Sequence, residues 1–422
     1  MLEEHLDEAC FLWTQWENGQ RSPVYTLREL AGGNESRLRA HLKALKAGGR
    51  RATERLLVPT LDEDDPERLR AASFVLLSEG EGENVEAVLQ AFTEATEAQR
   101  PAIARALSLS ERQGLSKHLQ PMLAATDPDV LAATVELLAF RRTLPVEGLS
   151  RLYRHELPRV RLAALNAAPT TSTPEDATAI REALAAPLPA LRAAGLALGL
   201  IRNRRDAFEA CLPWSDARNE AGHLARLAIA VGGERSELDG LLRLLERPEL
   251  RRDVLWALGF SGKAVAAEAC LPWLREPELA GIAAEAFSAI TGLRLTGKYL
   301  AARKEARDHE DEEPIPGPDA ELGQPEPAAL ERWWAEARNR LDRETRYLGG
   351  KAFSSEVLLE ALWNAPMRRR PVLALEFAIR TQGQHLVEVS DFSHVQARQL
   401  EEARSALGGR FWTGSFRARM RH

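Results

Sequence analysis

The chain has 422 residues, of which 45% are hydrophobic and 28% are charged, and its net charge is −6. This length exceeds one ordinary hydrophobic core, so it predicts several domains or an array of repeats. The weakly acidic total argues against a protein that coats nucleic acid, which needs many cations to neutralise phosphates. No apolar run reaches the roughly 18 residues that a membrane-spanning helix requires.

The cysteines and the N-terminus indicate a cellular compartment. Cys10, Cys211 and Cys270 are too few for a disulfide framework, and their number is odd. Sparse cysteines are typical of a reducing environment. The first residues, Met1 to His5, are acidic where a secretory signal would be basic. We therefore expect a cytoplasmic protein with no membrane partner.

Residues 1–49 are predicted to form an N-terminal helical cap. The first helix has apolar residues at spacings of three and four, which define one buried face. That face comprises Leu2, Leu6, Ala9, Cys10, Trp13 and Trp16. Two shorter helices, near 27–30 and 38–45, end at glycine pairs.

Residues 50–293 show an internal period. The hexamer Glu209–Trp214 recurs as Glu268–Trp273, 59 residues later. Prolines near the expected start of the second helix of each unit are spaced by about 30 or 60 residues; they are Pro66, Pro128, Pro158, Pro187, Pro248 and Pro277. A helix pair of about 30 residues cannot bury its apolar face alone, so neighbouring pairs must stack. The pattern predicts about eight helical hairpins.

These hairpins resemble a known class of repeat. Asp65-Pro66, Asp127-Pro128 and the recurring Leu-Arg-Ala-Ala of 69–72 and 191–194 are similar to HEAT repeats, particularly the short repeats of phycobilisome lyase-like proteins. The resemblance covers residues 50–293. It implies an all-α fold, an α-solenoid of HEAT-like helical hairpins, with the cap before it and a helical extension after it.

Three stretches carry a second resemblance. Glu3–Ala9, Ala286–Gly292 and Ala365–Pro371 are similar to a family of uncharacterised proteobacterial proteins. Members of that family often lie near type VI secretion genes, which implies an accessory role in that system. The family has no established catalytic residues, so the resemblance assigns none here.

The remainder of the chain divides into two parts. Residues 294–327 hold an acidic run, His309–Glu313, and several prolines, and are predicted to be a linker. The last part spans residues 328–422, and within it residues 332–422 carry 16 Lys and Arg against 10 Asp and Glu. They are predicted to be mainly helical. The expected elements are a helix over 330–347, a ninth repeat-like hairpin over 354–382, a short strand over 385–389 and a helix over 393–407.

The search for catalytic and metal-binding motifs finds no convincing match. The spacings typical of phosphate loops, dinucleotide-binding turns and zinc proteases do not occur. Cys211 and Cys270 would lie two layers apart, roughly 20 Å, which is too far for a disulfide or a shared zinc ion. The one ligand-like cluster is His385, Glu388, Asp391 and His394, where a helix cap at Asp391 or Ser393 is favoured over a metal site. We expect no cofactor, no metal and no enzymatic activity.

Three sets of residues are candidates for binding a partner. Regularly placed arginines on the second helices form an expected ladder, comprising Arg70, Arg161, Arg192 and Arg252. Arg368, Arg369 and Arg370 stand at a helix start, where cations oppose the helix dipole. The tail has the residue types of interface hot spots, in Trp412, Arg417 and Arg419. Each set either pairs within the chain or offers a surface to an acidic segment of a protein partner.

The sequence thus favours a non-enzymatic protein-binding scaffold or adaptor. One alternative is an immunity-type or chaperone-type protein that binds a single secreted effector. Another is a HEAT-like DNA glycosylase or lyase, which needs a carboxylate among aromatic residues in a basic groove. The acidic total charge disfavours that alternative, and it makes nucleic acid an unexpected partner.

Overall fold

The chain folds mainly into α-helices, which confirms the all-α prediction. The computed structural model describes residues 1–78, 82–171, 173, 176–301, 319, 321–407 and 411–421. Most of the expected acidic linker therefore lies outside the described residues. Within these ranges the sheet structure is one small hairpin, β1 (Tyr347–Leu348) and β2 (Lys351–Ala352), and no helix is long and apolar enough to cross a membrane.

Two compact units make up the chain, and each draws on both of its ends. Unit 1 contains residues 1–21, 25–179 and 386–399. Unit 2 contains residues 22–24, 180–385 and 400–422. Two helices, α13 (Asp176–Leu184) and α24 (Ser393–Ala406), cross the division. This partition differs from the four consecutive segments expected from the sequence.

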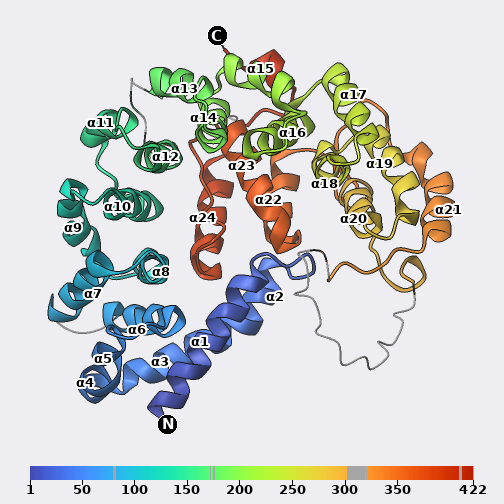
Figure 1. Cartoon of the computed structure of the whole chain (residues 1–422). Coiled ribbons are helices and arrows are strands. Elements are labelled where there is room, and N and C mark those ends of the chain that lie inside the picture. The colour runs from blue at the N-terminus through green and yellow to red at the C-terminus, as the bar shows by residue number, and fades with distance from the viewer. Residues whose placement is uncertain are drawn as a thin grey trace. The chain divides into compact units, whose positions relative to one another are not determined.

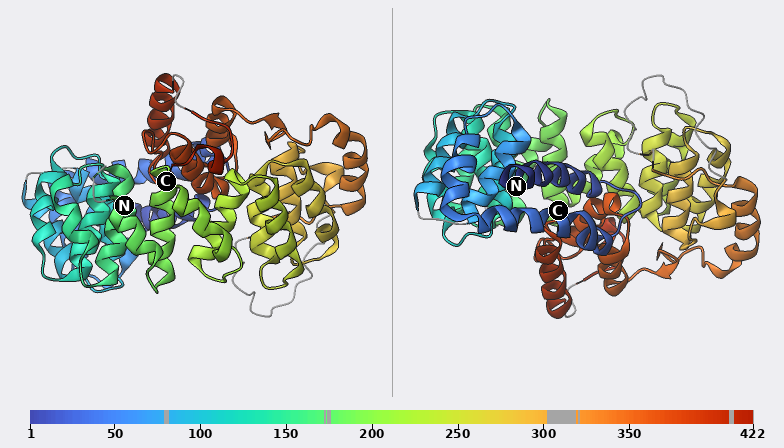
Figure 2. Two further views of the ribbon diagram at one scale, coloured as in Figure 1. Left: turned by 90° about the horizontal axis from the view of Figure 1, so that it is seen from above. Right: turned by 90° about the horizontal axis from the view of Figure 1, so that it is seen from below.

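Unit 1 is a succession of helices in which each longer helix packs on the next. In Figures 1 and 2, α6, α8, α10 and α12 lie side by side in chain order, and α1 packs on both α3 and α6. The helices are α1 (Leu2–Gly19), α2 (Leu27–Leu30), α3 (Ser36–Ala47), α4 (Gly49–Ala52), α5 (Val58–Thr60), α6 (Pro66–Ser78), α7 (Gly82–Glu94), α8 (Arg100–Leu109), α9 (Leu115–Leu119), α10 (Pro128–Phe140), α11 (Leu149–Tyr153) and α12 (Pro158–Ala167). Short π-helical turns occupy 31–35 and 53–57.

The first helix buries the face that its sequence predicts. Leu6, Ala9, Trp13 and Trp16 are fully buried, and Cys10 is 6% exposed. Glu3 and Glu4 lie in the first turn, where the helix dipole favours acidic side chains. The two tryptophans meet edge to face, with ring centroids 6.4 Å apart. This aromatic pair is the centre of the unit 1 core.

Unit 2 continues the pattern of paired helices. Its α14, α16, α18 and α20 pack one on the next, and α23 packs on α14 (Figure 1). The helices are α14 (Pro189–Ile201), α15 (Arg205–Trp214), α16 (Glu220–Gly232), α17 (Arg235–Arg243), α18 (Arg251–Ser261), α19 (Ala264–Cys270), α20 (Ala280–Thr291), α21 (Pro327–Ala337), α22 (Ser355–Asn364), α23 (Arg370–Arg380) and α25 (Phe416–Arg419). The 3-10 turns across the two units occupy 120–124, 146–148, 168–170, 244–246, 271–275, 297–299, 338–340 and 367–369.

The repeated hexamer marks equivalent places in two helix pairs of unit 2. Cys211 and Cys270 are both fully buried and unpaired with each other. Each thiol donates to the carbonyl four residues earlier, at 3.5 Å for Cys211 and 3.2 Å for Cys270. Burial raises the pKa of both thiols, to about 12 for Cys270. Both cysteines therefore fill the core and are not reactive thiols.

The hexamer tryptophans lie outside the fully buried core. Trp214 and Trp273 are half-buried, and each ring carries an arginine. The guanidinium of Arg192 lies 5.7 Å from the Trp214 centroid, and that of Arg251 lies 4.8 Å from the Trp273 centroid. Both arginines also donate through Nε to a carbonyl six residues before them, at 2.5 and 2.9 Å. All these positions differ by the same 59 residues as the hexamer.

The proline markers fall at two kinds of position. Pro66, Pro128 and Pro158 are the first residues of α6, α10 and α12, where a missing backbone N–H has no cost. The other three prolines, Pro187, Pro248 and Pro277, precede the starts of α14, α18 and α20 by two or three residues. In that place they end the preceding segment and do not begin the helix.

The C-terminal region departs most from expectation. The expected helix over 330–347 ends at Ala337, and the chain then forms the β1–β2 hairpin. Gly349 and Gly350 both have positive φ and form its turn. Their N–H groups donate to the carbonyls of Ala289 and Ile290 at 2.7 and 3.0 Å. The hairpin thus caps the C-terminus of α20, a tertiary role that local sequence does not reveal. The expected strand over 385–389 is absent: residues 385–388 have no regular secondary structure, and residue 389 lies in a turn.

Candidate functional site

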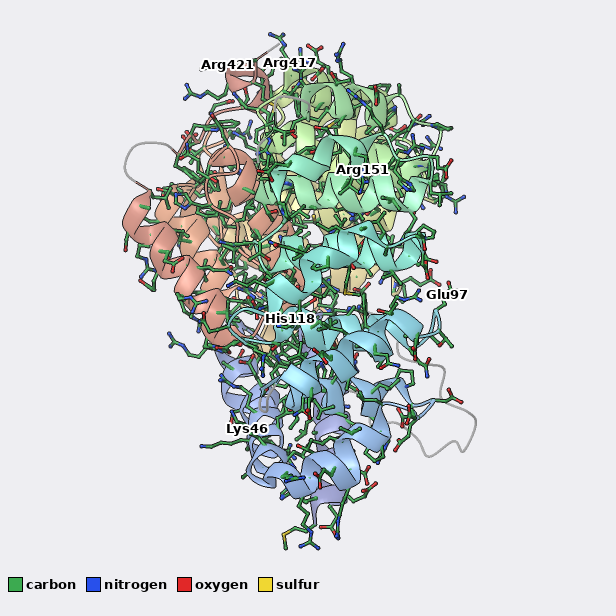
Figure 3. The ribbon with its side chains drawn as sticks, turned by 90° about the vertical axis from the view of Figure 1, so that its left-hand side faces the viewer. Lys46, Glu97, His118, Arg151, Arg417 and Arg421 are labelled. Atoms are coloured by element: carbon green, nitrogen blue, oxygen red, sulfur yellow. The ribbon has the colours of Figure 1, made fainter. Side chains whose placement is uncertain are left out.

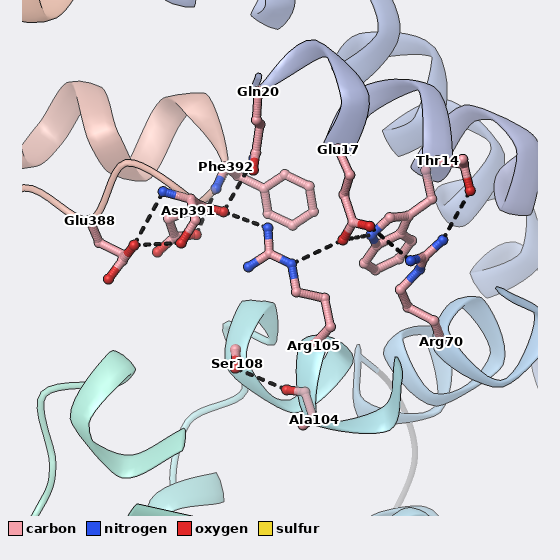
Figure 4. Close-up of polar contacts among 12 residues, drawn as sticks. Thr14, Glu17, Gln20, Arg70, Ala104, Arg105, Ser108, Glu388, Asp391 and Phe392 are labelled. Atoms are coloured by element: carbon pink, nitrogen blue, oxygen red, sulfur yellow. Dashed lines mark hydrogen bonds and ion pairs between the residues drawn. The ribbon is translucent and has the colours of Figure 1, made fainter. Parts of the chain in front are cut away.

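The first member of the expected arginine ladder makes internal contacts. Arg70 pairs with Glu17 at 2.9 Å and donates to Thr14 Oγ1 at 3.3 Å (Figure 4). Its guanidinium lies 5.3 Å from the Trp13 ring, and its side chain is only 12% exposed. Arg105, on α8, pairs with the same Glu17 at 3.1 Å. A second arginine thus joins Arg70 on one carboxylate.

The other ladder arginines also do not line one free face. Arg192 is held by the Trp214 ring and a backbone carbonyl. Arg252 is half-exposed, pairs with Asp319 and donates to the Glu278 carbonyl at 3.1 Å. Among the described residues, the buried Nε of Arg161 has no hydrogen-bond partner.

The three consecutive arginines are held inside unit 2. Arg368 is 10% exposed, and its guanidinium bonds Glu285, with Nε at 3.0 Å, and also pairs with Asp319. The Trp256 ring covers it, with its centroid at 4.9 Å. Asp319 comes from the expected linker, so one described linker acid is a structural partner.

The next two arginines are more deeply buried. Arg369 donates to the Gly259 carbonyl at 2.8 Å and lies 3.9 Å from the Phe260 centroid. Arg370 donates to the Leu362 carbonyl at 2.7 Å. Burial lowers the pKa of each guanidinium to about 10. Gly259 lies near the C-terminus of α18, where a cation offsets the unpaired carbonyls and the helix dipole.

The C-terminal tail packs back onto unit 2. Arg417 pairs with Glu237 at 2.9 Å, and the Trp412 ring lies 5.1 Å from the buried guanidinium of Arg380. Arg419 is exposed. Figure 3 shows Arg417 beside Arg421 at the end of the described chain. Of the three tail candidates, Arg419 is the one that presents its side chain to solvent.

The described residues contain no group of three or more His, Cys, Asp and Glu side chains placed to hold a metal ion. The ligand-like cluster seen in the sequence is used otherwise. His394 Nε2 contacts Glu111 at 2.7 Å, and Glu388 accepts from Ser390 Oγ at 2.5 Å. Asp391 Oδ1 accepts from the Phe392 N–H at 2.7 Å, one residue on, whereas a helix cap would accept from an N–H two or three residues on.

Residues 386–399, here termed the C-terminal strap, belong to unit 1. Side chains of unit 1 donate hydrogen bonds to the backbone carbonyls of the strap. Arg105 donates to the Ser390 carbonyl at 2.6 Å, and Gln20 donates to the same oxygen at 3.2 Å. Arg142 donates to the Leu386 carbonyl at 2.5 Å. Figure 4 shows Arg105 between the strap and Glu17. All three bonds run from a side chain of unit 1 to a main-chain carbonyl, a group that every peptide carries.

A buried carboxylate fixes the point where the strap becomes helical. Glu35 is 3% exposed and accepts from the Ser393 N–H at 3.0 Å and from its hydroxyl at 2.6 Å. It also accepts from Trp16 Nε1 at 3.0 Å. Ser393 begins α24, so Glu35 occupies the position of a helix-capping side chain supplied from far away in sequence.

The strap also fills the aromatic core of unit 1. Phe392 is 2% exposed, with its ring centroid 4.9 Å from Trp16 and 5.8 Å from Phe74. The guanidinium of Arg39 lies 5.7 Å from the same ring. Aromatic pairs in this geometry add to the energy of apolar burial.

Asp391 is the strap residue with the clearest electrostatic shift. Burial raises the pKa of its carboxyl to about 6. Glu388 and Glu111 raise the pKa further, and Arg105 lowers it. Burial in turn lowers the pKa of the Arg105 guanidinium, against the attraction of Glu17. The strap therefore carries a carboxyl group that titrates near neutral pH.

A groove of about 620 Å³ opens beside Phe392 in unit 1. Its apolar floor is formed by Leu42, Phe74, Val75 and Phe392, and Ser36, Ala40 and Ser78 complete the wall. Its charged lining is Arg39, Lys43, Lys46, Arg112 and Glu111, an excess of cations in a chain of net negative charge. Lys46 projects from α3 in Figure 3. We refer to this feature as the basic groove.

Comparison with known proteins adds little. No family model and no curated protein matches the chain. Among solved structures, it is similar to an engineered protein from the Northeast Structural Genomics Consortium at 15% identity, over 84% of this chain and 97% of that chain. The TM-score is 0.29, which carries no argument about the fold.

Sequence reasoning missed the residues that hold the strap. Arg105 was not placed in the ladder, although it occupies a helix position close to that of Arg70 and Pro101 stands in the first turn of its helix. Nothing in the sequence indicates the roles of Arg142 and Glu35, because neither lies in a motif and each bonds a segment more than 240 residues away. The basic groove could be sought in the spacing of Arg39, Lys43 and Lys46, which places them on one face of a helix.

Proposed function

We propose that this protein is a non-enzymatic scaffold that binds segments of other proteins. The observation that carries the proposal is the contact with the strap, in which Arg105, Gln20 and Arg142 donate to backbone carbonyls of a non-helical segment. The same chemistry serves a peptide from another chain, because main-chain carbonyls are independent of sequence.

The arrangement of helices supports a solenoid as the framework. The 59-residue equivalence of Arg192 with Arg251 and of Cys211 with Cys270 extends to individual hydrogen bonds. Such a repetition is what stacked HEAT-like hairpins produce, and helical solenoids present extended surfaces to partners. On the strength of the family resemblance alone, we propose type VI secretion components or effectors as the first partners to test.

Reconstitution of a binary complex tests the scaffold proposal. The full chain is affinity-purified from its host, each copurifying protein is produced separately, and the two are mixed. We expect one partner to form a stoichiometric complex by size-exclusion chromatography and calorimetry. If every purified candidate fails to bind the purified chain, the proposal is wrong. Rescue of cells from a toxic partner would indicate the immunity-type alternative.

A further inference from the structure

We propose that the basic groove is the docking site for an acidic peptide segment that carries an apolar anchor side chain. This inference rests on the proposed scaffold function and names the partner chemistry and the surface. It concerns unit 1 alone, and it uses residues that the strap leaves accessible at the surface.

The positive charge of the groove favours a negatively charged ligand. Arg39, Lys43 and Lys46 lie at spacings of four and three on α3, so their side chains share one face. All three are exposed. The acidic group of the lining, Glu111, already contacts His394 at 2.7 Å. A ligand that enters this groove therefore meets a surplus of positive charge.

The floor of the groove selects an apolar anchor. Leu42 is 4% exposed and Val75 is 3% exposed, and both belong to the apolar floor against which an aliphatic side chain can pack. Phe392 comes from the strap, so the groove is complete only when the strap is seated. Small exposed residues, Ser36 and Ala40, leave room at the rim. A concave, mostly apolar site with a few placed charges is the usual form of a ligand pocket.

The same features favour a peptide over nucleic acid. Single-stranded nucleic acid needs open aromatic faces on which bases stack. Here the Phe392 ring already meets Trp16, Phe74, Arg39 and His394.

Fluorescence anisotropy with labelled synthetic peptides tests the proposal on the full chain. The probe is a short peptide that alternates glutamate with leucine. We expect it to bind more tightly than two relatives, one with lysine in place of glutamate and one with serine in place of leucine. Binding should weaken as salt rises, because exposed charges are screened. A labelled oligothymidine that binds more tightly than the acidic peptide would overturn the proposal in favour of nucleic acid.

Two substitutions locate the binding in the groove. Lys43 is exposed and makes no hydrogen bond or ion pair within the described parts of the chain, so Lys43→Glu leaves the fold intact. We expect it to weaken peptide binding roughly five- to tenfold. Ala40→Trp fills the rim and should abolish binding. The matched control is Lys117→Glu, the same charge change on exposed α9 outside the groove, which should bind as the unmodified chain does.

The outcomes separate this inference from the scaffold proposal. If Lys43→Glu and Lys117→Glu bind the acidic peptide equally, or no peptide binds at all, the groove is not the docking site. If the reconstituted partner still forms its complex with Lys43→Glu and Ala40→Trp, the scaffold function stands and the groove proposal fails. If no stoichiometric partner exists while the peptide binds the groove, the scaffold proposal fails instead.

Discussion

At the scale of single residues, several buried arginines of this chain hydrogen-bond to its own backbone. Arg346 donates to the Phe260 carbonyl at 2.9 Å and Arg380 to the Val231 carbonyl at 2.8 Å, at the C-terminal ends of α18 and α16. Both also pair with the buried carboxylate of Glu376. Arginine suits this role because its guanidinium stays charged and presents several donors in one plane.

Glu35 is expected to be the costliest single carboxylate to remove from unit 1. Glu35→Ala leaves three buried donors, on Trp16 and Ser393, without an acceptor, which costs about 2–4 kcal/mol of unfolding free energy. Glu35→Gln retains one carboxamide oxygen and should cost less. Urea denaturation measures both, with exposed Glu97→Ala as a control that should be neutral. Equal stability of the Ala variant and the control would contradict the role of Glu35 as the acceptor for these donors.

Asp391 should make unit 1 less stable as the pH rises through its titration range. Its folded-state pKa, about 6, lies above the ordinary value, so the folded state binds the proton more tightly. Stability from this group is present below about pH 4 and is lost as the pH rises to about 6, by at most 2–3 kcal/mol. Charges facing the carboxyl from neighbouring segments are Glu388, Glu111, Arg105 and Arg141.

Asp391→Asn separates this effect from other titrations. The neutral amide avoids burying a charge, so the variant should be more stable than the unmodified chain at pH 7 and equal to it near pH 4. Unfolding by urea across this pH range measures the difference. A difference that is the same at both pH values would show that the Asp391 carboxyl does not titrate as its burial indicates.

At the scale of elements, the sequence predicted what depends on local pattern. The face of α1, the N-cap of α22 at Ser354 and the start of α24 at Ser393 follow from apolar spacing and capping residues. The β1–β2 hairpin and the strap were missed because tertiary contacts set them. Gly349 and Gly350 donate to α20, and the strap accepts hydrogen bonds from Gln20 after α1, from α8 and from the turn after α10.

The duplicated helix pairs of unit 2 make a prediction about equivalence. Arg192→Ala and Arg251→Ala each remove one bond to a helix-end carbonyl and one contact with a tryptophan ring. Each should cost about 1–2 kcal/mol of unfolding free energy. The exposed Arg243→Ala is the control. A large loss in one variant with none in the other would mean that the two sites are not energetically equivalent.

At the scale of the whole molecule, both units depend on the end of the chain. Residues 386–399 belong to unit 1 and residues 400–422 to unit 2. In unit 2, the Phe416 ring lies 5.7 Å from Phe208, and the Arg421 carbonyl accepts from the Arg205 N–H at 2.7 Å. The four consecutive segments expected from the sequence could not show this, because domain boundaries read from composition assume that neighbours in sequence pack together.

Truncation after residue 385 should therefore weaken both units. Hydrogen exchange is expected to accelerate in α1, which loses Phe392 against Trp16, and in α16, which loses Phe416 against Gly232. The control is a chain that retains the end but carries Arg419→Ala, where both helices should keep their protection. Unchanged exchange in α1 of the truncated chain would show that the strap is dispensable for unit 1.

The position of the strap near the end of the chain also delays the completion of unit 1 during translation. Glu35 and Ser393 are separated by 358 positions. At typical translation rates of about 5–20 residues per second, roughly 20–70 s pass between the synthesis of the two residues. During that interval the carboxylate and the aromatic pocket for Phe392 exist without their partners, so a nascent unit 1 exposes a ready-made peptide-binding surface. A protein that bound there would delay folding, and a chaperone that shielded it would have a defined target on the growing chain.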